Sequence, residues 1–277
     1  RPYCQWQFDS QTDAVQLERP SPDVAVVHLN RTARRNAMDL ASMERLGHEL
    51  EDVLKDPALR VLILTGRGSA FCAGLDLGAL LDAQQQLHMD AADAYALQLV
   101  YEGVVRRLRN NRVVVIAAVN GVAVGAGMGL ALAADIRFAS SNASFLVGAV
   151  KVGLSAGECG ISYHLPRFVG ASRAFELMLT GRAVGAEEAL RIGLVADVVA
   201  PQDLMARSLA CARQVLANSP YSTAHTKQLM WTNLDAPSLP AALELENHTQ
   251  VLGLMTQDFT EAVQAFMEKR PPHFSGR

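Results

Sequence analysis

The sequence has few charged and few aromatic residues, and neither sign of charge predominates. Of its 277 residues 19% are charged and 6% are aromatic, whereas 50% are apolar, and the formal net charge is −3. So high an apolar fraction with so little net charge excludes an intrinsically disordered chain. The lack of a basic excess argues against nucleic acid as the main ligand, although a local basic patch can still bind a small anion.

Cysteines are also scarce. Cys4, Cys72, Cys159 and Cys211 stand far apart and form no CxxC pair. This pattern fits neither a disulfide framework nor a zinc site, and His, Asp and Glu show no metal-ligand spacing. We therefore expect reduced thiols, no bound metal and an intracellular location, in the cytoplasm or in an organelle matrix. The first residues lack the pattern of a secretory signal peptide.

Only one apolar run, residues 113–134, has the length of a membrane helix. A span needs about 20 apolar residues, but Asn120 interrupts this run and glycines cluster in its second half. Asp135 follows immediately. We expect a buried strand, a turn and a helix here, and no membrane span.

Hydrophobic periodicity indicates an α/β fold in residues 1–200. Continuous apolar runs predict strands at 24–29, 61–65, 113–119, 136–139 and 144–147, and helical spacing predicts helices at 38–55, 90–108 and 129–134. Strands that alternate with helices favour a largely parallel sheet. Further helices are predicted at 172–180, 186–191, 201–218, 221–231 and 241–267. Residues 201–277 could not bury their apolar stripes alone, so we expect them to pack on the core or on another subunit.

A glycine-rich turn is the strongest chemical signal. Glycines stand at 121, 125, 127 and 129, between a predicted strand and a predicted helix. Glycine permits close approach of a ligand, and a helix N-terminus offers free N–H groups and a positive dipole end. The turn therefore suits a negatively charged oxygen, while close packing of helix on sheet is the alternative interpretation.

Two more segments carry similar signals. In Phe71-Cys-Ala-Gly-Leu-Asp76, Gly74 allows the N–H of Leu75 to point at a ligand, and Asp76 is expected to cap the next helix. Glu158 lies between Gly157 and Gly160 in an apolar segment. A desolvated carboxylate there would have a raised pKa, as a general base needs, although an exposed loop or first-turn glutamate is the alternative.

Together these segments resemble the crotonase superfamily, the enoyl-CoA hydratase/isomerase family. The matching residues are Arg35-Asn-Ala37, Phe71-Cys-Ala-Gly-Leu-Asp76, Asn120-Gly-Val-Ala-Val-Gly-Ala-Gly127, Ala134-Asp-Ile136, Gly153-Leu154, Leu165-Pro166, Leu179-Thr-Gly181, Ala189-Leu-Arg-Ile-Gly-Leu-Val195 and Ala265-Phe-Met-Glu-Lys-Arg270. The resemblance implies a spiral core of ββα repeats at 1–200 and a helical oligomerisation region at 201–277, assembled as a homotrimer or hexamer.

The resemblance also implies an acyl-CoA thioester substrate, with coenzyme A as part of that substrate and no separate cofactor. The N–H groups of Leu75 and Ala126 match the family's oxyanion hole, which stabilises an enolate. Further positions match residues that contact CoA: Arg35, Ala37, Ala73, Asp76, Lys269 and Arg270. Of these, Lys269 or Arg270 would reach the CoA of a neighbouring subunit.

Two departures from the family pattern bear on the reaction. Hydratases of the family carry glutamates at the positions of Gly129 and Ala149, and both are missing here. Glu158 matches the single catalytic glutamate of some Δ3,Δ2-enoyl-CoA isomerases. The sequence therefore favours double-bond isomerisation. The alternatives are a hydratase or other lyase with its acid elsewhere, such as Asp82 or Asp90, and a catalytically silent acyl-CoA-binding protein.

Overall fold

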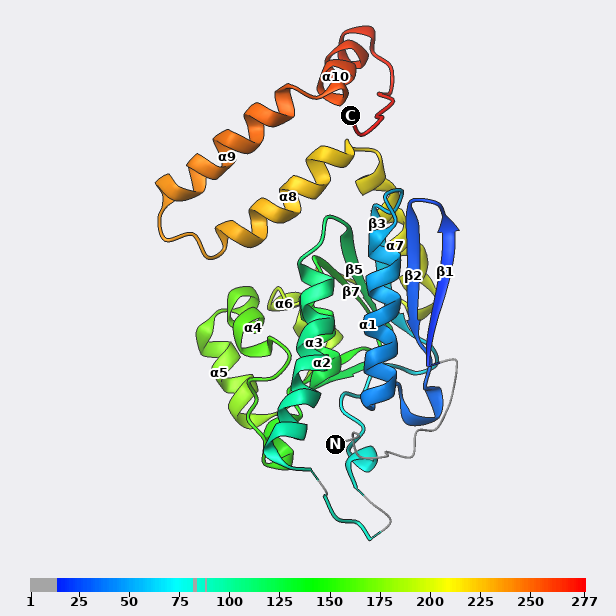
Figure 1. Cartoon of the computed structure of the whole chain (residues 1–277), viewed down its shortest axis with the longest axis vertical. Coiled ribbons are helices and arrows are strands. Elements are labelled where there is room, and N and C mark those ends of the chain that lie inside the picture. Colours follow the sequence, from blue (N-terminus) through cyan, green and yellow to red (C-terminus); the bar gives the residue numbers. More distant parts are fainter. Residues whose placement is uncertain (1–13, 82–83, 88) are drawn as a thin grey trace.

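The computed structural model describes residues 14–81, 84–87 and 89–277 (Figure 1). Four units of two strands and a helix follow one another: β1 (Val15–Ser21), β2 (Val24–Leu29) and α1 (Leu40–Lys55); β3 (Val61–Gly66), β4 (Ala70–Cys72) and α2 (Ala91–Arg109); β5 (Val114–Val119), β6 (Val122–Val124) and α3 (Ala126–Ala133); β7 (Ile136–Ser140), β8 (Ser144–Leu146) and α4 (Ile161–Val169). The predicted α/β class with ββα repeats is confirmed. Short 3-10 helices lie between them: η1 (Thr32–Arg34), η2 (Leu77–Leu80) and η3 (Ala149–Val152).

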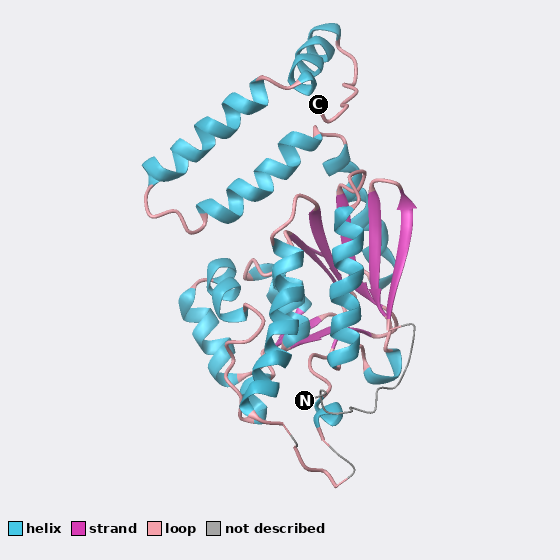
Figure 2. Ribbon diagram, viewed as in Figure 1, coloured by secondary structure: helices cyan, strands magenta, loops and turns pink. Residues whose placement is uncertain are grey.

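The first strand of each later unit joins a six-stranded sheet of order β1-β2-β3-β5-β7-β10, where β10 is Asp197–Val199. Only β1 pairs antiparallel; the other pairs are parallel. Side chains alternate between the faces of a strand. One face packs under α1 and α2, and the other packs against α7 (Leu204–Leu216). Both faces are therefore covered (Figure 2), which is why these strands read as continuous apolar runs.

Both strands of the first unit belong to the six-stranded sheet, whereas the second strand of each later unit joins a smaller sheet of order β4-β6-β8-β9, where β9 is Ala183–Gly185. The pairs β4–β6 and β6–β8 are parallel, and β8–β9 is antiparallel. Parallel neighbours end at the same edge of a sheet. The segments that follow β4, β6 and β8 therefore leave the sheet side by side.

The rest of the chain is mainly helical. It comprises α5 (Ala171–Thr180), α6 (Ala186–Arg191), η4 (Pro201–Asp203), α7, α8 (Pro220–Asn233), α9 (Leu239–Leu254) and α10 (Gln257–Glu268). The α8–α9 hairpin and α10 extend away from the sheets (Figure 1), and none of the residues of α9 is buried. Within the described ranges no helix combines the length and the hydropathy that a bilayer crossing requires.

Two predicted helices differ from the structure. The short helix predicted at 129–134 begins at Ala126, because burial of the whole segment outweighs the low helix propensity of its glycines. The single helix predicted at 241–267 is wrong: it is broken between α9 and α10. Thr256 caps α10 there by accepting a hydrogen bond from the N–H of Phe259.

Candidate active site

The candidate site lies where three parallel strands of the smaller sheet end. Ala70 of β4 pairs with Val122 of β6, and Val122 pairs with Ser144 of β8. The turn at 73–76 follows β4, the turn at 125–126 follows β6, and the segment that leads to Glu158 follows β8. The topology thus brings together the three stretches that the sequence singled out.

The first predicted oxyanion amide belongs to Leu75. The N–H of Met38 donates to the carbonyl of Gly74 at 2.8 Å, and the N–H of Asp76 donates to the carbonyl of Met38 at 3.0 Å. In such a parallel bridge the flanking residues face the partner strand, so the polar groups of Leu75 point to the opposite side. In the described part of the chain the N–H of Leu75 donates to no protein acceptor. It is available for a ligand.

The second predicted amide is that of Ala126, the first residue of α3. The first N–H groups of a helix have no acceptor within the helix, and they lie at its positive end. Gly125 precedes Ala126 with φ 51° and ψ −119°, a conformation that side chains rarely adopt. The glycine thus turns the chain from β6 directly into a helix whose first amide donates to no acceptor among the described residues.

The two turns lie against each other. A Cβ atom placed on Gly74 would lie 2.6 Å from the carbonyl oxygen of Val124 and 3.6 Å from the nitrogen of Ala126. Likewise, a Cβ on Gly127 would lie 2.2 Å from the carbonyl oxygen of Cys72. Only glycine permits so close an approach, and it lets the turn of Gly74 lie next to the amide of Ala126.

Glu158 completes the arrangement. A Cβ atom placed on Gly125 would lie 2.9 Å from Oε1 of Glu158, so the carboxylate lies against the residue that precedes Ala126. The side chain therefore does not extend into solvent away from the turns. Burial raises the pKa of Glu158 above its ordinary value. A carboxylate with a raised pKa next to two free amides is a suitable general base.

Arg31, which the sequence does not single out, supports the first turn. Its guanidinium donates to the carbonyl of Ala37, and it lies 2.9 Å from Oδ2 of Asp39 and 3.1 Å from Oδ2 of Asp76. All three charged side chains are largely buried. The prediction that Asp76 caps the next helix is wrong, because its side chain makes no capping bond and instead pairs with Arg31. Nothing in the sequence distinguishes Arg31 from its neighbours Arg34 and Arg35.

The residues predicted to contact CoA fall into two groups. The first group surrounds the bridge at Met38: the N–H of Ala73 donates to the carbonyl of Arg35 at 3.0 Å, and Ala37 and Asp76 flank the same bridge. The Arg35 side chain is exposed. The second group, Lys269 and Arg270, follows α10 at the other end of the molecule (Figure 1). Within one chain the structure does not bring the two groups together.

The other acidic candidates lie away from this arrangement. Asp90 caps α2 by accepting a hydrogen bond from the N–H of Asp93 at 2.9 Å, and it is exposed. Asp82 lies outside the described residues. Ala149 is buried at the start of η3, and Gly129 is buried within α3. Among the residues the structure describes, no group of three or more His, Cys, Asp or Glu side chains is arranged to hold a metal ion.

This arrangement can stabilise a negatively charged oxygen and move a proton beside it. The N–H groups of Leu75 and Ala126 belong to adjacent turns, and where two such donors share one oxygen, losing one typically costs about 3–4 kcal/mol of barrier. A single carboxylate can remove a proton and return it. No second carboxylate of the described residues accompanies Glu158 at the turns, because Asp76 is paired with Arg31.

Comparison with known proteins points to one family. The family model described as enoyl-CoA hydratase/isomerase matches residues 20–277. A probable enoyl-CoA hydratase of Mycobacterium leprae is 43% identical, and the match covers 95% of this chain and 90% of the relative. A solved structure of a probable enoyl-CoA hydratase/isomerase from Mycobacterium abscessus has a TM-score of 0.87 at 38% identity, covering 95% of this chain and 99% of that one. A monofunctional enoyl CoA isomerase from M. smegmatis has a TM-score of 0.70 at 41% identity, covering 83% and 98%. The predicted crotonase-like fold is thereby confirmed.

Proposed function

The chain belongs to the enoyl-CoA hydratase/isomerase family and is an enzyme of that type, and from this premise we propose that it shifts a double bond of an acyl-CoA thioester from Δ3 to Δ2. The observation that carries the proposal is the position of the Glu158 carboxylate against Gly125, next to the amide of Ala126. The names of the relatives include both hydratases and an isomerase. The choice between hydration and isomerisation therefore depends on the carboxylates of this chain.

In the proposed reaction Glu158 acts twice. Its carboxylate removes a proton from C2 of the substrate, and the electron pair of the C–H bond forms a dienolate whose oxygen accepts hydrogen bonds from Leu75 and Ala126. The protonated Glu158 then returns the proton to C4, so the double bond moves from C3–C4 to C2–C3. One base and one oxyanion hole suffice, and no atoms are gained or lost.

Hydration is the second candidate function, favoured by the name of the relative from Mycobacterium leprae. Adding water requires one group to activate the water and another to deliver a proton to C2. The two positions where hydratases of the family carry glutamate are Gly129 and Ala149 in this chain. Asp90 caps a helix, which leaves it poorly suited as a substitute acid.

The direct test is to incubate the purified enzyme separately with a 3-enoyl-CoA and with a 2-enoyl-CoA and to separate the products chromatographically. We expect the 3-enoyl thioester to be converted to the 2-enoyl thioester, with 3-hydroxyacyl-CoA forming at most as a minor product. Rapid hydration without isomerisation would support the second candidate. Tight thioester binding without any turnover would indicate a silent binding protein.

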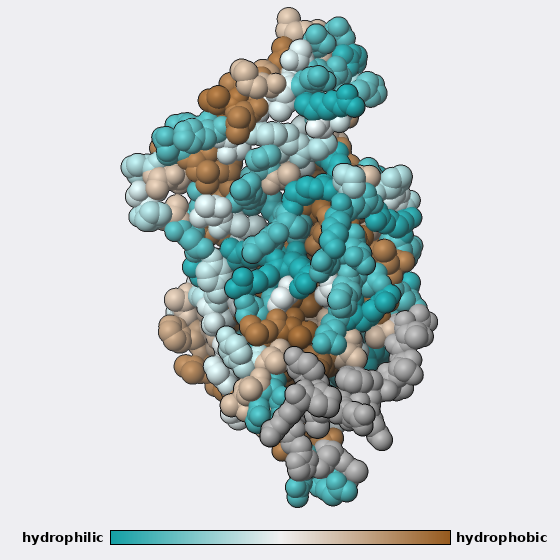
Figure 3. All heavy atoms as spheres, viewed as in Figure 1, coloured by the Kyte–Doolittle hydropathy of each residue, from teal (hydrophilic) through white to brown (hydrophobic). Residues whose placement is uncertain are grey.

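We also propose that the protein assembles as a homotrimer, or as a hexamer of two trimers, through its C-terminal helices. Hydrophobic side chains lie exposed on α9, where they form brown surface in Figure 3, and also on α10. Monomeric proteins rarely expose contiguous apolar surface of this kind. The exposed side chains include Leu239, Leu243, Val251, Leu252, Phe259, Val263 and Phe266. Assembly would cover this surface, and it would offer Lys269 or Arg270 a route to the CoA of a neighbouring subunit.

The substitution Leu252→Glu should weaken this assembly. Leu252 is 61% exposed in the chain, so a charge there costs the isolated chain little but would be buried at an interface. We expect a shift toward monomers in light scattering coupled to size-exclusion chromatography. Asn247→Glu adds the same charge to the same helix and serves as the control. An unchanged trimer in the Leu252→Glu variant would contradict the proposed interface.

The substitution Arg31→Gln should lower kcat/KM roughly tenfold, because Asp39 and Asp76 lose the cation that holds the turn of Leu75 in place. The infrared stretching band of a ¹³C-labelled thioester carbonyl bound to the variant should show weaker polarisation than in the wild type. Arg19→Gln, which removes an exposed ion pair with Asp56, is the matched control and should change neither value. A carbonyl band unaffected by Arg31→Gln would show that Arg31 does not position the amide.

A further inference from the structure

Gly129 lies so close to Cys159 that a side chain at position 129 would overlap it. A Cβ atom placed on Gly129 would lie 2.5 Å from Cβ of Cys159 and 2.8 Å from its carbonyl oxygen. Gly129 lies within α3, where every residue is buried, so the helix has little room to move away. The space that a side chain at 129 would need is therefore occupied by Cys159.

Cys159 also sets the direction of the chain after Glu158. Its φ of 47° is left-handed, and Gly160 continues with φ 76°, so the chain bends sharply before α4 begins at Ile161. We call residues 158–160 the 158–160 turn. Since a left-handed cysteine is strained, contacts with its surroundings must hold it, and Gly129 of α3 lies directly against it. The same bend places the carboxylate of Glu158 against Gly125.

The thiol of Cys159 itself is not a reactive group. Burial is the main cause that raises its pKa to about 12, and the neighbouring Glu158 acts in the same direction. The thiol is therefore protonated at neutral pH and is a poor nucleophile. The role of Cys159 is packing against α3, not covalent chemistry.

We infer that Gly129 is a specificity-determining residue: position 129 can hold either a side chain or the 158–160 turn, and the glycine commits the enzyme to a reaction with the single carboxylate of Glu158. A glutamate at 129, as the resemblance gives for hydratases, would displace the turn that positions Glu158. The inference rests on the proposed isomerisation and deepens it. The reaction type is thereby set by packing as well as by the presence or absence of an acid.

The test is the variant Gly129→Ala. We expect kcat for isomerisation to fall at least about tenfold with little change in KM, because the amides and the CoA contacts stay in place while Glu158 moves. The acidic limb of the kcat–pH profile should shift to lower pH, since a displaced Glu158 becomes more hydrated. The double variant Gly129→Ala/Cys159→Gly should recover part of kcat, because it removes the Cβ contact and tolerates the left-handed bend.

The control is Gly47→Ala, another glycine within a helix, α1. A Cβ there would meet Val104 at 3.6 Å, an ordinary van der Waals distance, so kcat and the pH profile should stay unchanged. Cys159→Val enlarges the other residue of the contact and leaves the sequence of α3 unchanged. It should lower kcat and shift the pH limb as Gly129→Ala does, which keeps the inference testable if Gly129→Ala does not fold.

A third readout separates this inference from the proposed function. In Gly129→Ala the displaced Cys159 should be alkylated by iodoacetamide faster than in the wild type, as measured by mass spectrometry of the peptide. If the wild-type enzyme does not isomerise its substrate, the proposed function is refuted. The alkylation rate of Cys159 in Gly129→Ala would still test whether Gly129 and Cys159 compete for the same space. The inference would be overturned if Gly129→Ala had the same kcat, pH profile and alkylation rate as the wild type.

Discussion

Replacing Glu158 by glutamine is expected to lower kcat for isomerisation by about 10⁴-fold, the upper end of the range for general acid–base catalysis. The amide is nearly isosteric with the carboxylate but can neither remove the C2 proton nor return one to C4. Because the same group acts in both steps, no second residue can compensate for either. Substrate binding should change little, since the oxyanion amides and the CoA contacts are untouched. Glu158→Asp, which retains a carboxylate, should keep a measurable part of the activity.

The pH dependence gives this prediction a second readout. Burial raises the pKa of Glu158 above its ordinary value of 4.5, and only the deprotonated form is a base. In the wild type, kcat should therefore rise with pH through a midpoint above 4.5. The residual activity of Glu158→Gln should lack this limb. An unchanged limb in the variant would assign the titration, and with it the base, to another group.

The free energy of unfolding should follow the opposite trend with pH. The contribution of Glu158 to it should fall as the pH rises, whereas kcat rises. A carboxyl group whose pKa is raised by folding stabilises the protein fully below its unfolded pKa, and this contribution is lost as the pH rises through the folded pKa. At neutral pH the charged Glu158 therefore lowers the free energy of unfolding. Glu158→Gln should be at least as stable as the wild type in a thermal melt near pH 7. A well-folded variant without activity excludes unfolding as the cause of the loss.

The sequence predicted the frame of the fold because its elements are long. The strands β2 and β3 each have four consecutive apolar residues and β5 has six, and α1 has an apolar face along its length, with Asp39 as its N-cap. By contrast, β4 and β6 have three residues each, too few to show a period, and the analysis missed them. These short strands are the ones that lead into the turns of Gly74 and Gly125.

The convergence of the site could not be derived from the residues alone. Gly74 and Gly125 signal turns, but their contact depends on the pairing of β4 with β6, which involves residues about 50 positions apart. Among the arguments from sequence, only the resemblance to a family names Leu75 and Ala126 as a pair. Neither the residue pattern nor the resemblance revealed that Cys159 packs on Gly129. A glycine in a sequence does not indicate which residue fills the space beside it.

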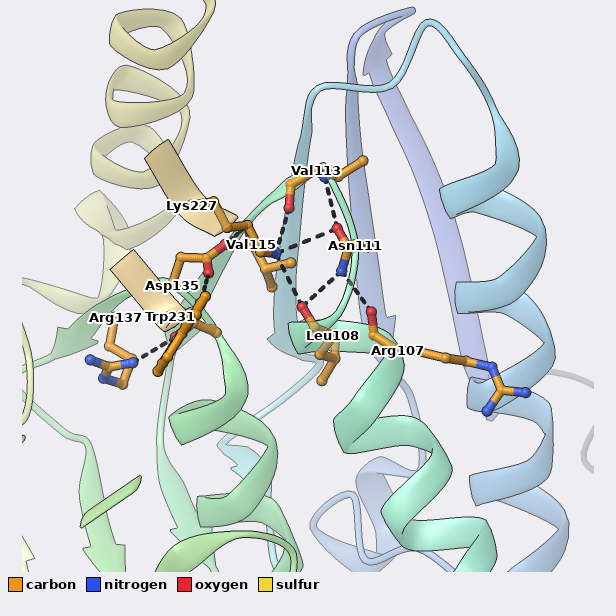
Figure 4. A network of polar contacts seen from close by, with 10 residues as sticks. Arg107, Leu108, Asn111, Val113, Val115, Asp135, Arg137, Lys227 and Trp231 are labelled. Atoms are coloured by element: carbon orange, nitrogen blue, oxygen red, sulfur yellow. Dashed lines mark hydrogen bonds and ion pairs between the residues drawn. The ribbon is translucent and has the colours of Figure 1, made fainter. Parts of the chain in front are cut away.

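Of the substitutions proposed here, replacing Lys227 is expected to lower the free energy of unfolding the most. Its ammonium group is buried beneath α8, where it donates to the carbonyl of Val113 at 2.7 Å and lies 3.0 Å from Oδ2 of Asp135 (Figure 4). Trp231, one turn further along α8, donates to Oδ1 of the same carboxylate at 2.7 Å. The Lys227 side chain is 3% exposed and that of Asp135 is 13% exposed, so water cannot replace the pair. These contacts anchor the C-terminal helices to the core.

The cost of breaking such a pair from one side is about 3–5 kcal/mol, because the remaining charge stays buried without its partner. Burial lowers the pKa of Lys227 and the charge of Asp135 opposes this shift, so the lysine depends on that carboxylate to stay protonated. For a chain of this size, a loss of this magnitude lowers the melting temperature by roughly 6–20 °C. Lys227→Met should show this decrease, whereas Lys55→Met, which removes an exposed pair with Glu51, should change it little.

A double variant distinguishes an unpaired charge from lost packing. Lys227→Met/Asp135→Asn leaves no buried carboxylate without a counter-charge, so its melting temperature should exceed the value expected from adding the two single effects. In Lys227→Met, α8 should also loosen, which would expose Trp231, shift tryptophan emission to longer wavelength and open the segment before α8 to limited proteolysis. A melting temperature equal to that of the wild type would contradict the anchor. Strictly additive single effects would show that Lys227 and Asp135 act independently.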